Sequence, residues 1–112
     1  NGHELTLPER INESIAHWAS LWNAPGLASQ VTVEFSSRMI RSLGRCYPER
    51  RLIRLSWRLT KAPRSILLEA LCHELAHIAA HELNGGKNGP HGPAWADLMR
   101  SAGFEPRTRL RY

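Results

Sequence analysis

Two histidines and a glutamate stand at a spacing that suits metal chemistry, in the run His73-Glu74-Leu75-Ala76-His77. In a helix, at about 100° per residue, His73 and His77 lie one turn apart on one face, so both imidazoles can reach one zinc ion. Glu74 can contact a zinc-bound water without being a ligand. Zinc lowers the pKa of that water toward about 7, so the carboxylate can take its proton and later protonate a leaving amine. Glu74 is therefore the expected catalytic residue.

A catalytic zinc also needs a third protein ligand and an open fourth position. His81 repeats the four-residue spacing, but it lies about 12 Å along the helix from His73, which is too far to share an ion. His91 is preferred, because a glycine-rich loop gives the chain room to turn back before it. Glu105 is an alternative ligand beyond the last helix. The expected site holds one Zn²⁺ per chain between His73, His77 and His91.

The helix that carries the motif is expected over roughly 65–82. Its interior is almost wholly apolar, which is typical of a helix at the centre of a domain. Unpaired charge is costly there, and a metal would supply the partner. The glycine-rich residues 84–90 predict a loop, and residues 92–103 predict a further helix whose apolar stripe would hold His91 rigidly.

The elements before this helix predict a sheet. An amphipathic helix is expected over 8–23, a strand over 31–35, and two more strands around 39–46 and 51–57, joined by a turn at 47–50. Alternation along the last strand predicts which side chains face the core. These are Ile53, Leu55 and Trp57.

Length and composition set the class of protein. The 112 residues suit a single α+β domain with a three-stranded antiparallel-type sheet, and about 1–7 and 104–112 are expected as tails. No stretch approaches the roughly 18 apolar residues of a membrane helix, and the polar first residues do not resemble a signal peptide. Two cysteines, Cys46 and Cys72, are too few for a disulfide framework. We therefore expect an intracellular protein that is neither secreted nor membrane-bound.

The formal charge of +5 is unevenly distributed. Residues 38–64 contain nine basic side chains and one acid, so this segment carries +8 and the rest of the chain −3. Such an arginine field suits DNA phosphates, but it also suits a solvated strand face or the attraction of acidic substrate proteins. The candidate nucleic-acid contacts are Arg38, Arg41, Arg45, Arg54, Arg58 and Lys61.

Together these residues resemble the SprT-like family of Spartan-type zinc metallopeptidase domains. The resemblance rests on the 73–77 motif, the glycine-containing spacer and the run His91-Gly92-Pro93-Ala94-Trp95 that opens a helix. Further similarities lie upstream, at Ser36-Ser37-Arg38-Met39, Gly44-Arg45-Cys46, Ile53-Arg54-Leu55-Ser56 and Leu68-Glu69-Ala70-Leu71-Cys72.

The resemblance implies a zincin-type α+β fold and a zinc peptidase mechanism. It makes His73, His77 and His91 the zinc ligands and Glu74 the catalytic acid and base. For Spartan-type members it also implies cleavage of proteins bound or crosslinked to DNA.

The leading hypothesis is therefore a zinc metallopeptidase that takes an extended protein or peptide substrate along an edge strand. One alternative is a nucleic-acid-binding module whose zinc is structural or whose activity has decayed, and another is a metal-free interaction domain. Glu74 argues against a purely structural zinc. The group that stabilises the transition state stays open between Arg109, Tyr112 and another residue of the C-terminal tail.

Overall fold

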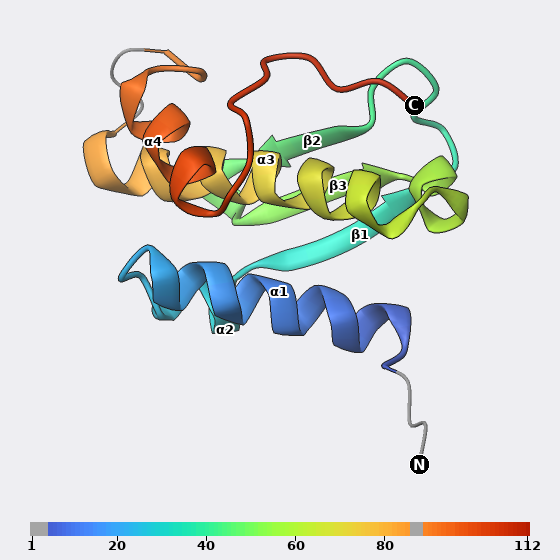
Figure 1. Cartoon of the computed structure of the whole chain (residues 1–112), viewed down its shortest axis with the longest axis horizontal. Coiled ribbons are helices and arrows are strands. Elements are labelled where there is room, and N and C mark those ends of the chain that lie inside the picture. The colour runs from blue at the N-terminus through green and yellow to red at the C-terminus, as the bar shows by residue number, and fades with distance from the viewer. Residues whose placement is uncertain (1–4, 86–88) are drawn as a thin grey trace.

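The computed structural model describes residues 5–85 and 89–112. In this part of the chain, four α-helices and one three-stranded sheet form an α+β domain, with α3 lying across the sheet and α1 beside it (Figure 1). The α-helices are α1 (Leu7–Leu21), α2 (Gly26–Gln30), α3 (Arg64–Asn84) and α4 (Pro93–Ser101). The strands and short 3₁₀ turns are β1 (Thr32–Ser36), β2 (Gly44–Tyr47), η1 (Pro48–Arg50), β3 (Leu52–Ser56) and η2 (Trp57–Lys61). None of these described helices combines the length and the apolar character that crossing a bilayer requires.

The first helix begins at a well-formed cap. The main-chain N–H of Glu9 donates to the Thr6 hydroxyl at 3.3 Å, and that of Thr6 donates to the Glu9 carboxylate at 2.8 Å. This capping box satisfies two main-chain donors and stabilises a helix start by about 1 kcal/mol. The buried stripe that follows, Ile11, Ile15 and Trp18, packs the helix into the core.

The prediction of an antiparallel sheet was wrong, because the sheet is mixed. Its strand order is β1-β3-β2, with β1 parallel and β2 antiparallel to β3. The reason lies in burial: β3 is buried along most of its length, whereas β1 and β2 are half exposed. The most apolar strand takes the centre, so the chain leaves β1, forms the far edge as β2, and returns between the two.

The expected strand around 39–46 is much shorter, since β2 begins only at Gly44. The residues before it form a loop, which is held by side chains from the adjacent end of β3 and from η2. The Ser56 hydroxyl donates to the main-chain oxygen of Met39 at 3.0 Å, and Arg58 Nη2 donates to that of Ile40 at 3.0 Å. These bonds satisfy loop carbonyls that a strand would have paired, so the loop needs no ladder.

The prediction that Trp57 faces the core was also wrong. Ile53 and Leu55 are fully buried, as expected, but the Trp57 side chain is 49% exposed. The strand ends at Ser56, whose hydroxyl accepts a hydrogen bond from the Arg58 N–H and begins η2. A turn at this point ends the two-residue alternation on which the prediction depended.

The C-terminal segment, defined as Phe104–Tyr112, contains no helix or strand but packs against the domain. Phe104 and Leu110 are half-buried against the core. Figure 1 shows the segment, in red, passing β2 and ending near the loop between β1 and β2. The segment therefore covers one side of α3.

Candidate metal centre

The three histidines expected to bind zinc lie together. His73 and His77 come from α3, and His91 comes from the chain just before α4. One ring nitrogen from each lies within 4.8 Å of the others, and His91 Nε2 lies 3.3 Å from His73 Nε2. His73 is buried, His77 is half-buried and His91 is exposed. The cluster is therefore closed on the helix side and open to solvent on the loop side.

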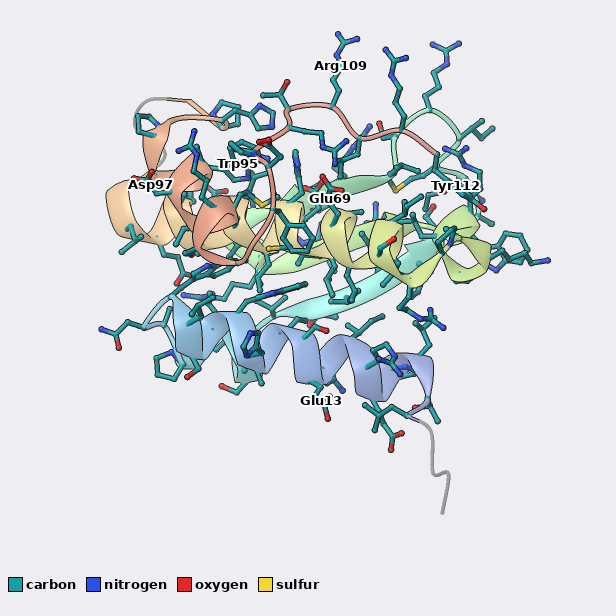
Figure 2. The ribbon with its side chains drawn as sticks, viewed as in Figure 1. Glu13, Glu69, Trp95, Asp97, Arg109 and Tyr112 are labelled. Carbon is teal, nitrogen blue, oxygen red and sulfur yellow. The ribbon has the colours of Figure 1, made fainter. Side chains whose placement is uncertain are left out.

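Trp95 joins the two helices that carry the cluster. Its Nε1–H donates to the main-chain oxygen of His73 at 3.1 Å. Its ring stacks on His77 at 5.3 Å between centroids and meets His73 and His91 edge-on at 4.9 and 4.7 Å. Figure 2 shows Trp95 between α4 and α3. In the sequence Trp95 was noted only as part of the run from His91 that opens a helix, and its contacts with all three histidines were not foreseen.

The electrostatics of the cluster favour neutral imidazoles. Burial, and after it the charge of the neighbouring histidines, lowers the pKa of His73 to about 4 and that of His77 to about 3. Burial also lowers the pKa of His91. A metal binds the neutral form of histidine, and three imidazole nitrogens with an open side suit a catalytic zinc. The residues present therefore fit the ion that the motif implies.

Glu74 lies buried beside the cluster, with only 7% of its surface exposed. Burial raises its pKa to about 7, while a hydrogen bond from the Cys46 thiol and the charge of Arg45 oppose the rise. Burial and then Glu74 raise the pKa of the Cys46 thiol to about 12, so that thiol stays a donor. A carboxyl group with a pKa near neutrality can both accept and return a proton.

Gly44 of β2 makes room for the Glu74 side chain. A Cβ atom at this position would lie 2.9 Å from Glu74 Oε2 and 3.0 Å from Glu74 Cγ, closer than side chains tolerate. The carboxylate therefore rests directly on the backbone of the edge strand. The sequence placed Gly44 only in a run that resembles the SprT-like family, because no local pattern reveals a contact between two elements this far apart.

Two cavities flank the cluster and share Gly44, His73, Glu74 and Thr108. The first, of about 390 Å³, is lined beyond these residues mainly by side chains of the β1–β2 loop and the C-terminal segment. The second, of about 550 Å³, continues past His77, His91 and the edge of β2. Glu74 therefore stands at the middle of a cleft that runs along β2.

The two residues of the C-terminal segment named above as candidates to stabilise the transition state, Arg109 and Tyr112, lie in different places. Arg109 lines the first cavity, and Figure 2 shows its side chain extending outward at the rim. Tyr112 lies farther along, where its hydroxyl donates to the main-chain oxygen of Lys61 at 3.5 Å. His81 lines the second cavity, and like Glu105 it is not part of the three-histidine cluster.

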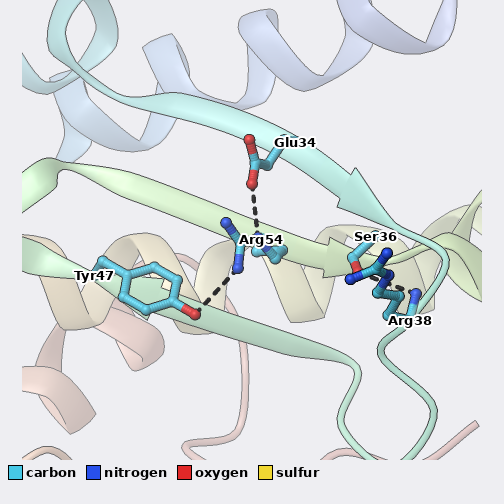
Figure 3. Close-up of polar contacts among 5 residues, drawn as sticks. All are labelled: Glu34, Ser36, Arg38, Tyr47 and Arg54. Carbon is cyan, nitrogen blue, oxygen red and sulfur yellow. Dashed lines mark hydrogen bonds and ion pairs between the residues drawn. The ribbon is translucent and has the colours of Figure 1, made fainter.

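The six basic candidates for nucleic-acid contact divide into two groups. Three of them make internal contacts. Arg54 pairs with Glu34 at 2.6 Å and donates to the Tyr47 hydroxyl at 3.3 Å (Figure 3). Arg58 donates to main-chain oxygens, and the Lys61 ammonium lies over the Trp57 ring. The other three line a groove of about 470 Å³ beside Tyr47, to which Arg54 also contributes. They are Arg38, Arg41 and Arg45.

Fold and site together define a small α+β domain with a three-histidine cluster and a buried glutamate on one helix. The SprT-like family matches residues 11–111, so the chain belongs to this family, and the resemblance seen in the sequence is confirmed. Proteins named Protein SprT from Pseudomonas paraeruginosa (strain PA7) and Pseudomonas aeruginosa (strains LESB58 and UCBPP-PA14) are each 36% identical over 70 residues. The match covers 62% of this chain and 42% of each relative, so the matched region is less than half of those proteins.

Proposed function

We propose that this domain is a zinc-dependent peptidase of the zincin type. The observation that carries the proposal is the juxtaposition of three neutral imidazoles with the buried carboxylate of Glu74 in an open cleft. A structural zinc needs a fourth protein ligand, and the three-histidine cluster contains no cysteine or carboxylate from the described residues. The arrangement favours catalysis over a purely structural metal.

The chemistry divides between the metal and Glu74. Bound zinc would supply a Lewis acid that polarises the scissile carbonyl and makes water a stronger nucleophile. Glu74 accepts the proton of that water and donates it to the leaving amine, and a pKa of about 7 suits both steps. The space left by the missing side chain of Gly44 accommodates this carboxylate.

The substrate in this proposal is an extended peptide. β2 is an edge strand, paired only with β3 in the sheet, and its residues line both cavities. A peptide can therefore add to the free edge of β2 through main-chain hydrogen bonds. The half of the cleft lined by Arg41, Arg109 and Arg111 favours substrates with acidic side chains.

The test is peptide hydrolysis by zinc-loaded protein, with Glu74→Gln as the inactive variant. We expect that change to lower kcat by about 10² to 10⁴-fold, because it removes the acid–base group but keeps its size. The matched control is Glu82→Gln on the same helix, which alters only an exposed ion pair with Arg51. Equal activity of wild type and Glu74→Gln would remove the proposal.

We infer that nucleic acid is a second partner, bound at the groove of Arg38, Arg41 and Arg45. Arg41 also lines the cavity at Glu74, so this groove adjoins the proposed active site. Each phosphate contact contributes to the salt dependence of binding, so Arg45→Ala should reduce the slope of log affinity against log salt by about one. Unchanged single-stranded DNA affinity in an Arg38→Ala, Arg45→Ala double variant contradicts this inference.

The same two assays separate the alternative function. Zinc and DNA binding without hydrolysis of any peptide supports a nucleic-acid-binding module with a structural or catalytically inactive metal. Hydrolysis that DNA accelerates supports a peptidase acting on DNA-associated proteins.

A further inference from the structure

Both ends of the C-terminal segment are fastened to the domain. At its start, Phe104 meets Trp18 edge-on, with 6.1 Å between ring centroids. At its end, Arg58 Nη1 donates to the main-chain oxygen of Tyr112 at 3.2 Å. Between these points, residues 108–111 line the first cavity, and Thr108 also lines the second. The segment is therefore a wall of the candidate site.

The middle of the segment is attached to α3 at Arg107. Arg107 Nε lies 3.3 Å from Oε2 of Glu69, which stands one helical turn before His73. The Glu69 side chain is only 15% exposed (Figure 2 labels it on α3), so Arg107 neutralises a largely buried charge. The N–H of Arg107 donates to the oxygen of Glu105 at 2.8 Å, closing a tight turn around Pro106. This turn fixes the direction of the Arg107 main chain.

One atom of the histidine cluster lacks a partner in this arrangement. His73 Nδ1 is buried and makes no hydrogen bond of good geometry with the described residues, while Nε2 of the same ring faces His91. The C-terminal segment lies beside this ring, since Thr108 lines both cavities together with His73 and Arg107 is paired with Glu69 one turn before it. In keeping with this position, the main chain of Arg107 raises the pKa of His73 as a hydrogen-bond acceptor does, against burial and the charge of His91, which lower that pKa.

We propose that Arg107 is a positioning residue of the metal centre. Its side chain anchors to Glu69, and its main-chain oxygen accepts a hydrogen bond from His73 Nδ1–H. That bond selects the tautomer whose Nε2 lone pair points at the metal, as partners of metal-bound histidines commonly do. The inference depends on the three-histidine site and not on the proposed peptidase activity, so failure of one is distinguishable from failure of the other.

Zinc affinity, measured by competition with a chromophoric chelator, tests the anchor. Glu69→Gln keeps the size of the side chain and removes its charge, and Arg107→Ala removes the partner. Each should weaken zinc binding by about tenfold, the lower end of the usual effect of such partners. Glu82→Gln and Arg100→Ala are matched controls, since they alter exposed ion pairs elsewhere, and both should bind as wild type.

The tautomer of His73 tests the hydrogen bond itself. In ¹⁵N-labelled zinc-loaded protein, His73 should show a protonated Nδ1 and a metal-bound Nε2, and Glu69→Gln should broaden or shift the Nδ1–H signal. Wild-type zinc affinity in both Glu69→Gln and Arg107→Ala overturns the proposal. So does a His73 ring that binds zinc through Nδ1.

Discussion

Replacing Gly44 with alanine should displace the Glu74 carboxylate with little effect on the fold. The new Cβ would lie 2.9 Å from Oε2, whereas ordinary contacts begin at 3.4 Å, so the carboxylate must move by about 0.5 Å. A misplacement of about 1 Å can cost about 10²-fold in rate, so we expect kcat to fall about tenfold. Zinc content should stay at the wild-type value, because the methyl group contacts Glu74 and not the histidines.

The assay is kcat and KM on a fluorogenic peptide, with zinc content measured on the same samples. Gly26→Ala is the matched control, since its Cβ would meet only the flexible Gln30 side chain, at 3.6 Å. It should leave kcat unchanged. Full activity in Gly44→Ala refutes the view that the Glu74 position matters, and loss of zinc would mean that the strand supports the histidines instead.

Three further predictions concern pH, packing and substrate choice. In metal-free protein, His73 and His77 have pKa values below that of an unfolded histidine, so the unfolded chain binds more protons as the pH falls. The free energy of unfolding should therefore fall by about 2 kcal/mol per histidine between pH 7 and pH 5. Zinc should restore this free energy. Urea titrations at both pH values check this, and a pH-independent midpoint counts against buried neutral histidines. Trp95→Phe removes the hydrogen bond to the His73 carbonyl and should lower stability by about 1–3 kcal/mol in thermal unfolding, whereas an unchanged Tm would show that this bond is dispensable. Arg111→Ala should lower kcat/KM for a glutamate-containing peptide more than for its glutamine counterpart, and equal losses would exclude charge recognition.

The local patterns predicted the helices better than the sheet. Capping and apolar periodicity located α1, α3 and α4 to within a few residues, because both are properties of nearby positions. Strand order depends on which strand buries both faces, and that is decided by contacts between distant segments. The exposure of Trp57 could not be predicted either, because the hydroxyl of Ser56 accepts a hydrogen bond that starts η2 and so ends the strand one residue before Trp57.

The candidate site shows the same division. His73 and His77 follow from a four-residue spacing, and His91 follows from a loop long enough to return. The residues that hold these side chains in place could not be predicted from sequence spacing. Gly44 acts through the space it leaves and Arg107 through its main chain, and neither property has a signature in one sequence.

The measurement that most directly tests the metal centre is zinc bound per chain in protein purified from zinc-replete medium. We expect about one zinc per wild-type chain and a large loss of affinity in His91→Ala, because only two histidines of the cluster would remain. His81→Ala is the matched control, since His81 lines the cleft outside the cluster, and it should bind zinc as wild type does. A wild-type chain without zinc, or a His91→Ala variant that binds it equally well, would contradict the three-histidine site.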